Sequence, residues 1–435
     1  MTTSLSKTSR YVVLFAAVGG LLFDGVELGL MPVASLSVSQ SLLGDAFTPA
    51  LGGDWFARFT AALMLGAAVG GIFLGSLGDR IGRTRALGVS VLFYSVFAGL
   101  GAFARTQEQM LVLRFMVGLG VGGVWPNAVA LAAECWPDKS RPIIAGLMGV
   151  ALNGGILMLS QIARIWHITP ESWRWIFQLA AAPAALGVLV LTVIPESPLW
   201  LATRSSRRKE AHSVLGEASQ SLVTSSATRR SEGTLRELFR PPLLRLTLIG
   251  ILIGSIPMVG AWAASKWMIP WADKIGGASE PGYKAITQGW WALGAVLGSF
   301  FGAQIAAWLG RRRAYAIISA AATVLTSLMF LGTAPLQASF LPIVFAQGFV
   351  ATLFFGWLPL YLPELFPTRV RAAGSGIAYN VGRFATALGV MAAGALFAAM
   401  GGSYSKVGAT CGLIYLLGLV VIGFAPDTTD KKLDA

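Results

Sequence analysis

Two acids stand three residues apart in an otherwise apolar stretch near the start of the chain, in the segment Asp24-Gly-Val-Glu27. At this spacing both side chains lie on one face of a helix. Two carboxyl groups in a low-dielectric site cannot both ionise easily, so one of them is expected to hold a proton, as a proton carrier must. Arg114, in another apolar stretch, keeps its charge and can pair with either acid. A pair that breaks when the acid titrates would couple proton movement to a conformational change; the alternative is a static ion pair.

A second group of candidates could bind a substrate. Arg383 lies midway along an apolar stretch without acids, where a fixed cation could hold a carboxylate through two hydrogen bonds or could serve a structural role. Lys266 is a further candidate, although its long side chain could reach the outer surface instead. Uncharged polar and aromatic side chains could complete the site or simply bridge and pack helices, namely Asn153, Gln161, Asn380, Trp357, Tyr361 and Tyr379.

The elements that position these residues are apolar runs long enough to cross a membrane. The 435-residue chain is 55% hydrophobic and only 12% charged, which excludes an ordinary soluble protein. A span needs about 20 apolar residues. We expect twelve spans, near 11–38, 55–78, 86–104, 108–134, 142–165, 173–194, 243–271, 284–309, 314–334, 338–362, 371–398 and 405–425. The segment 39–54 is predicted to be a loop, and the long polar segment 195–242 a linker with short helices near 206–222 and 232–240.

An internal repeat relates the two halves of the chain. Gly82-Arg-Thr-Arg85 matches Gly310-Arg-Arg-Arg313, and a pattern of Glu, aromatic, Pro and Arg starting at Glu134 matches one starting at Glu364. Pro195-Glu196 likewise matches Pro426-Asp427. The offsets agree to within a few residues, so two homologous six-span halves are predicted, with boundaries 1–194 and 243–435 around the linker 195–242.

Charged residues cluster where the spans end on one side. With both termini inside, most of the 33 Lys and Arg fall on the cytoplasmic side, so the net charge of +13 reflects topology rather than nucleic-acid binding. We expect salt bridges between the halves, formed when this side is closed, and Asp79 could cap the helix near 372–374; the alternative is a solvated rim. The candidate gating residues are Asp79, Arg80, Arg83, Glu134, Arg141, Glu196, Arg311, Glu364 and Arg371.

Several of these segments resemble signatures of the major facilitator superfamily. The segment 75–85, GSLGDRIGRTR, is similar to the family's loop between spans 2 and 3, and RFMVGLGVGG from Arg114 resembles its proton-coupling helix. DGVE at 24–27 and WPNAVAL at 125–131 resemble the aromatic-acid and metabolite–proton symporter branch, although Val26 replaces that branch's aromatic residue. PESPLWL from Pro195 resembles the sugar-porter and organic-ion branches. In the second copy of the loop signature, Ala307 replaces the acid at Asp79.

The resemblance implies an all-α membrane protein with twelve helices in two pseudo-symmetric six-helix bundles, working by alternating access. We expect a proton-coupled symporter of a small organic anion, aromatic or short-chain, in the plasma (inner) membrane, with cytoplasmic termini, lipid contacts and a monomeric state. Alternatives are a sugar or polyol transporter or facilitator, a drug or cation exporter coupled to protons, and a non-transporting sensor. No cofactor, metal site or enzyme activity is expected, because His167 and His212 are too few and too far apart to bind a metal, and no phosphate-binding loop is present.

Overall fold

The described residues form twelve helices that are long and apolar enough to cross a membrane. The computed structural model describes residues 5–136, 141–202, 236–367 and 370–429, without the side chains of Arg141, Pro142, Ala145 and Ala372. No strand occurs in these ranges, and all twelve expected spans are confirmed. The helices are α1 (Lys7–Leu43), α2 (Pro49–Ile81), α3 (Arg83–Leu100), α4 (Gln107–Cys135), α5 (Arg141–Ile165), α6 (Arg174–Ala180), α7 (Ala184–Val193), α10 (Leu243–Val259), α11 (Met268–Gly276), α12 (Tyr283–Leu309), α13 (Arg311–Ser327), α14 (Phe340–Leu365), α15 (Arg371–Ala399), α16 (Tyr404–Gly412) and α17 (Ile414–Phe424).

The connecting segments include the one between α1 and α2 and the linker between the two halves. The connection predicted at 39–54 is shorter than expected, because α1 continues to Leu43 and α2 already begins at Pro49. Thr48 accounts for the early start: its hydroxyl accepts from the Leu51 N–H at 3.2 Å, and a proline in the first turn suits a helix N-terminus. The expected linker helix 206–222, most of 232–240, and His212 lie outside the described residues.

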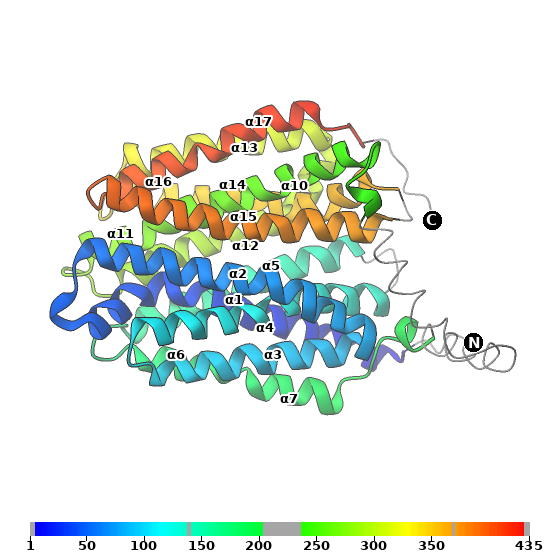
Figure 1. Ribbon diagram of the computed structural model, residues 1–435, viewed down its shortest axis with the longest axis horizontal. Coiled ribbons are helices and arrows are strands. Elements are labelled where there is room, and N and C mark those ends of the chain that lie inside the picture. Colours follow the sequence, from blue (N-terminus) through cyan, green and yellow to red (C-terminus); the bar gives the residue numbers. More distant parts are fainter. Residues whose placement is uncertain (1–4, 137–140, 203–235, 368–369, 430–435) are drawn as a thin grey trace, which may run out of the picture.

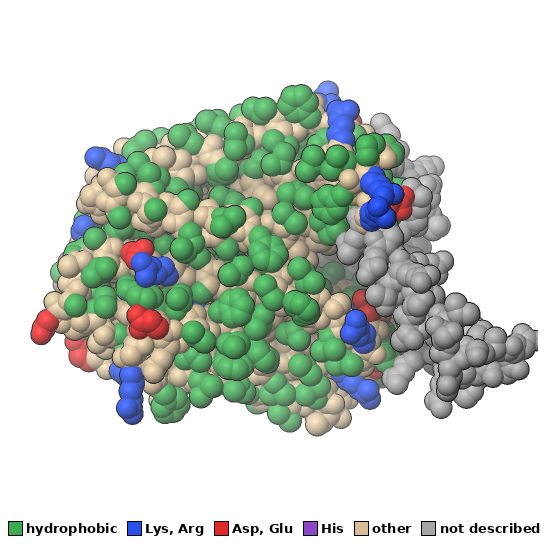
Figure 2. All heavy atoms as spheres, viewed as in Figure 1, with side chains coloured by type: hydrophobic (Ala, Val, Ile, Leu, Met, Phe, Trp, Pro, Cys, Tyr) green, Lys and Arg blue, Asp and Glu red, His purple; other side chains and the backbone are tan. Residues whose placement is uncertain are grey.

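The helices form two bundles that lie side by side. In Figure 1, α1 to α7 make up one bundle and α10 to α17 the other, with α2 against α15 and α5 against α12 at the junction. The two described ends of the chain lie on the same face, which we call the terminal face; the opposite one is the far face. Figure 2 shows hydrophobic side chains over the middle of the molecule and charged ones toward these two faces. This distribution suits a protein that spans a bilayer.

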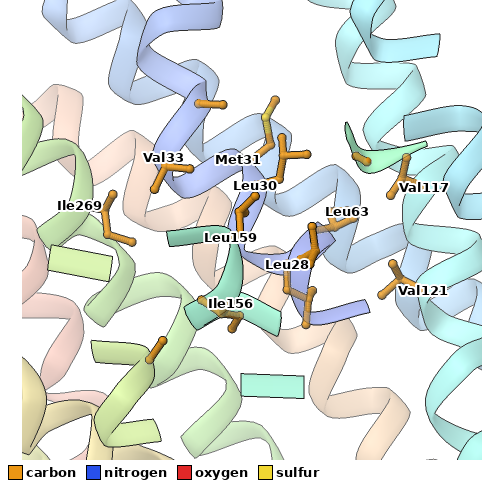
Figure 3. Packing of buried hydrophobic residues seen from close by; sticks show 14 of the residues in the cluster. Leu28, Leu30, Met31, Val33, Leu63, Val117, Val121, Ile156, Leu159 and Ile269 are labelled. Carbon is orange, nitrogen blue, oxygen red and sulfur yellow. The ribbon is translucent and has the colours of Figure 1, made fainter. Parts of the chain in front are cut away.

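Buried side chains from both bundles form one continuous core at the junction. Figure 3 shows Leu28, Met31 and Val33 of α1 near Ile156 and Leu159 of α5, with Ile269 of α11 contributed by the other bundle. Since lipid tails are as apolar as these side chains, close fit rather than exclusion from water holds the helices together.

Close backbone contact between α1 and α5 fixes the position of the acids in α1. A Cβ added to Gly25 would lie 1.8 Å from the Leu152 carbonyl oxygen, and one added to Gly155 would lie 1.8 Å from the Leu22 carbonyl oxygen. Both glycines therefore allow a backbone approach that no side chain permits. The segment Leu22–Gly25, which carries Asp24, is thereby held against α5.

The neighbouring glycines of α5 provide a matched test. Gly155→Ala should force α1 and α5 apart and lower the thermal midpoint of the purified protein by several degrees, whereas Gly154→Ala should leave it unchanged, because no atom lies within 4 Å of a Cβ added there. Equal midpoints for the two variants would show that the close contact does not matter for stability.

Candidate functional site

A cavity lies between the two bundles, near the middle of the molecule. Its volume is about 110 Å³, room for several water molecules. The walls are largely apolar, and aromatic rings contribute much of them, namely Trp125, Trp262, Trp291, Phe355 and Tyr379. The polar groups on the walls include one acid and two cations: Asp24 of α1, Arg383 of α15 and Lys266, which precedes α11. An apolar pocket with a few convergent charges is the usual form of a small-molecule site.

The two acids of α1 have different environments. Glu27 is paired with Arg114 of α4: Arg114 Nη2 donates to Glu27 Oε2 at 3.0 Å, and both side chains are 1% exposed. Asp24 lines the cavity instead, and its Oδ1 has no hydrogen-bond donor among the described residues. Arg383 of the other bundle lines the same cavity and lies near enough to influence the Asp24 carboxylate electrostatically. Of the two pairings left open by the sequence, the structure contains the one between Arg114 and Glu27.

Removal of Arg114 should be costly because it would leave Glu27 buried without a counter-charge. Breaking a buried ion pair from one side costs about 3–5 kcal/mol, whereas replacing both members by neutral groups costs less. We therefore expect Arg114→Met to lower the thermal midpoint of the detergent-solubilised protein much more than the double change Glu27→Gln with Arg114→Met. If the double variant is as unstable as the single one, packing rather than charge gives Arg114 its importance.

Arg383 connects the two bundles at the cavity. Its Nη1 donates to the Ala67 carbonyl oxygen of α2 at 3.0 Å, and its guanidinium carbon lies 5.3 Å from the centroid of the Tyr379 ring. No ion pair joins Arg383 to α10, α12 or α14 among the described residues. The guanidinium thus keeps donors free for a further acceptor in the cavity.

Lys266 does not reach the surface. It is 1% exposed, and its Nζ lies 3.5 Å from the centroid of the Trp291 ring and 5.6 Å from that of Trp262. The chain around it is irregular: α10 ends at Val259 and is followed by a π-helical turn, Gly260–Ala264, and a 3₁₀ turn, Ser265–Trp267. These turns direct the ammonium group into the cavity wall.

The other predicted substrate contacts divide into two sets. Asn153 and Tyr379 line the cavity, and the Asn153 amide donates to Ser299 Oγ at 2.8 Å. Asn380 packs against α2 at Gly71, one turn from Arg383, and Gln161 lies in a separate crevice toward the far face. Trp357 and Tyr361 belong to the apolar core of the second bundle near the terminal face.

The assignments of Gln161, Trp357 and Tyr361 to the substrate site therefore need correction. The Trp357 indole donates to the Arg311 carbonyl oxygen at 2.9 Å, and the Tyr361 hydroxyl donates to the Pro426 carbonyl oxygen. These bonds satisfy the polar atoms of both rings within their own bundle. Trp125, Trp262, Trp291 and Phe355 are the cavity aromatics that the sequence analysis did not single out. The four-residue spacing from Trp262 to Lys266 is the one signal that could have revealed part of this set.

The charged residues of the terminal face form the same cluster in each half. Arg83 Nε donates to Glu134 Oε1 at 3.1 Å and Nη1 contacts Asp79 at 2.6 Å, while the Ser197 hydroxyl donates to the other oxygen of Glu134. In the second half Arg311 pairs with Glu364 at 2.9 Å, and the Thr428 hydroxyl donates to Glu364. The matched positions are those of the sequence repeat.

The ion pairs that the structure describes at the terminal face lie within the halves, and bridges between halves that form when this side closes remain a prediction. Among the described residues, Arg83 pairs with two carboxylates of its own half, and Arg311 pairs with Glu364 of the other half's own cluster. Asp79 pairs with Arg83, and no hydrogen bond joins it to α15 among the described residues. Glu196 accepts from the Thr84 N–H at 3.0 Å, Arg80 is exposed, and Arg371 is half-buried at the start of α15. The Arg141 side chain lies outside the described residues.

The bundles are joined near the far face. Lys284 of α12 donates to Ser37 Oγ of α1 at 3.1 Å and also pairs with Asp273 at 3.1 Å. The rings of Phe56 and Trp267, one from each bundle, lie 5.1 Å apart. The cavity is thus covered from the far face by contacts between the halves.

Comparison with known proteins agrees with this architecture. The family model described as "Sugar (and other) transporter" matches residues 12–435. The chain belongs to this family. It is a transporter of the major facilitator type and not an enzyme.

Individual relatives cover most of the transporter. The cis,cis-muconate transport protein of Acinetobacter baylyi is 28% identical over 97% of this chain and 92% of its own length. The gallate transporter of Pseudomonas putida is 27% identical, over 86% of this chain and 83% of its own. An inward-open structure of the xylose transporter XylE from E. coli superposes with a TM-score of 0.69 at 19% identity, with 98% of each chain covered. The structural match establishes the fold alone.

Proposed function

We propose that the transporter is a proton-coupled symporter of a small organic anion, aromatic or short-chain. The observation that carries this proposal is that Asp24 and Arg383, each from a different bundle, line the same cavity. Arg383 offers the bidentate geometry that carboxylates favour, and Asp24 is an acid that can bind a proton. With Lys266 also on the wall, the cavity has more cations than acids, which favours an anion over a neutral sugar or a cationic drug.

The relatives support an organic acid as substrate. They include transporters of cis,cis-muconate, gallate and niacin, compounds that share a carboxyl group. The matched share of each relative exceeds four-fifths of its length, so the likeness includes the region of the cavity. We place the protein in the inner membrane with its terminal face toward the cytoplasm, because basic residues of connecting segments are concentrated there.

The coupling follows from competition for Arg383. When Asp24 is ionised it attracts the guanidinium, and a substrate carboxylate must compete with it. When Asp24 binds a proton, that attraction disappears and the guanidinium is available to the substrate. Proton and anion therefore favour each other's binding, as symport requires. The buried pair of Glu27 and Arg114 holds α1 to α4 next to Asp24. Protonation of Glu27 would break this pair, which is a second way for a proton to change the contact between the two helices.

Alternating access then requires the two bundles to rock about the cavity. Opening toward the far face would break the contact of Lys284 with Ser37 and separate Phe56 from Trp267. The Arg–Glu–hydroxyl clusters of the terminal face would keep the helix ends of each half together during this movement.

Uptake into proteoliposomes tests this proposal. A panel of carboxylates and sugars is offered with and without an inwardly directed proton gradient. We expect one class of acids to enter and the gradient to stimulate its entry. Sugar entry that is indifferent to the gradient would replace the proposal with that of a sugar facilitator.

A further inference from the structure

The buried ammonium group of Lys266 has no hydrogen-bond partner. Its Nζ is fully shielded from solvent, and no acceptor for its three protons is found among the described residues. The two indole rings beside it attract a cation through their faces. Such contacts do not replace the water lost by a buried ammonium, whose desolvation costs several kcal/mol. The ammonium therefore lacks a protein acceptor in the described part of the chain, and a ligand in the cavity that Lys266 lines can supply one.

The carboxylates of the neighbourhood are already engaged elsewhere. Glu27 is bound to Arg114, and Asp24 faces Arg383. Asp273, seven residues beyond Lys266, forms its ion pair with Lys284 at 3.1 Å. The cavity and the neighbouring pair of Arg114 and Glu27 thus contain three cations and two carboxylates. Protonation of Asp24 would increase this excess of positive charge. A charge excess in the membrane interior calls for a negatively charged ligand.

A polar network holds the parts of this site in place. Gln347 of α14 accepts from the Trp291 indole at 2.8 Å and donates to Ser265 Oγ at 2.6 Å and to Thr326 Oγ1 at 3.2 Å. One amide therefore fixes both the ring that covers the ammonium and the residue before Lys266. This degree of support is characteristic of a binding site with a defined geometry.

Lys266 and Arg383 lie at different depths in the cavity. Gly382 of α15 packs on Met258 of α10, and Gly389 packs on Val259 and Ala263, so the two segments run in the same direction. Lys266 lies about seven residues farther along than the level of Arg383, or roughly 10 Å at the rise of a helix. The two side chains therefore start from different depths of the cavity wall, and each can hold its own carboxylate.

We propose that Lys266, between Trp262 and Trp291, is a second anion subsite, and that the transported compound carries two acidic groups, one bound by Arg383 and the other by Lys266. This inference rests on the proposed transport of organic anions and specifies their class. The aromatic walls between the two cations suit a planar or unsaturated link between the acidic groups.

Equilibrium binding to the purified full-length protein tests the inference. The probes are linear C4–C8 dicarboxylates and benzene dicarboxylates, each measured beside its own monoamide, which keeps the shape and removes one charge. The wild type should bind the preferred diacid about 10-fold or more tightly than its monoamide. Lys266→Met should abolish most of this difference, because it should weaken binding of the diacid far more than binding of the monoamide. Lys274→Met, which removes an exposed lysine of the same segment, is the matched control and should retain the difference.

The possible results separate this inference from the proposed function. Equal binding of each diacid and its monoamide by the wild type would overturn the second subsite and leave organic-anion transport standing, and this comparison needs no variant. Equal weakening of both ligands by Lys266→Met would also overturn it. If the wild type binds no member of either series, the proposed function fails and the inference fails with it.

Discussion

Asp24→Asn should abolish proton-driven accumulation of the substrate. The amide is nearly the same size as the acid but cannot carry a proton, so an inward proton gradient should no longer raise the internal concentration above the external one. Exchange of internal for external substrate needs no net proton movement and should persist, because Arg383 and the cavity walls are unchanged. Counterflow and gradient-driven uptake in the same proteoliposomes measure both activities.

Two controls make this result specific to Asp24. Asp54→Asn removes a partly exposed acid of α2 whose pairing with Arg58, four residues away, contributes little, and it should accumulate substrate normally. Glu27→Gln leaves Arg114 buried without its partner, so it should reduce folded protein as well as transport. If Asp24→Asn still accumulates substrate and well-folded Glu27→Gln does not, the proton carrier is Glu27, and the Arg114 pair is the coupling element.

Arg383→Gln should weaken the binding of carboxylates far more than that of neutral analogues. A hydrogen bond to a charged group contributes about 1.5–3 kcal/mol, which corresponds to about 10- to 100-fold in affinity. The affinity for the corresponding primary amide should change by less than about 3-fold, since the guanidinium gains little from an uncharged acceptor. Competition binding with the acid and its amide gives the two values.

The control for this change is another arginine. Arg313→Gln removes an exposed arginine near the start of α13 and should leave both affinities as in the wild type. An equal loss of affinity for acid and amide in Arg383→Gln would assign Arg383 a structural role, through its hydrogen bond to the Ala67 carbonyl oxygen between α15 and α2.

The repeat was the most informative feature of the sequence. It predicted equivalent positions for Arg83 and Arg311 and for Glu134 and Glu364, and the structure pairs them in the same way in both halves. The sequence alone does not show whether such an ion pair links the two halves or lies within one of them. An ion pair depends on distances between spans, and the spacing of residues along one span does not contain that information.

The cavity was predictable only in part. Intramembrane charge identified Asp24, Arg383 and Lys266 because each is costly in a bilayer. Aromatic side chains gave no comparable signal: these spans are apolar on all sides, so the sequence does not reveal which face turns inward. The sequence therefore does not distinguish Trp357, which lies in the core of one bundle, from Trp291, which lines the cavity. The irregular turns at 260–267, which direct Lys266 inward, depend on contacts with other spans such as Gln347 with Ser265.

The central claim is that a proton and an organic anion cross the membrane together, with Asp24 as the proton carrier. A pH electrode in a weakly buffered suspension of proteoliposomes tests it directly when the transported acid is added as its neutral salt. The wild type should raise the external pH as substrate enters, while Asp24→Asn and protein-free liposomes should not. Entry of labelled substrate into wild-type proteoliposomes without any change in external pH would contradict the account.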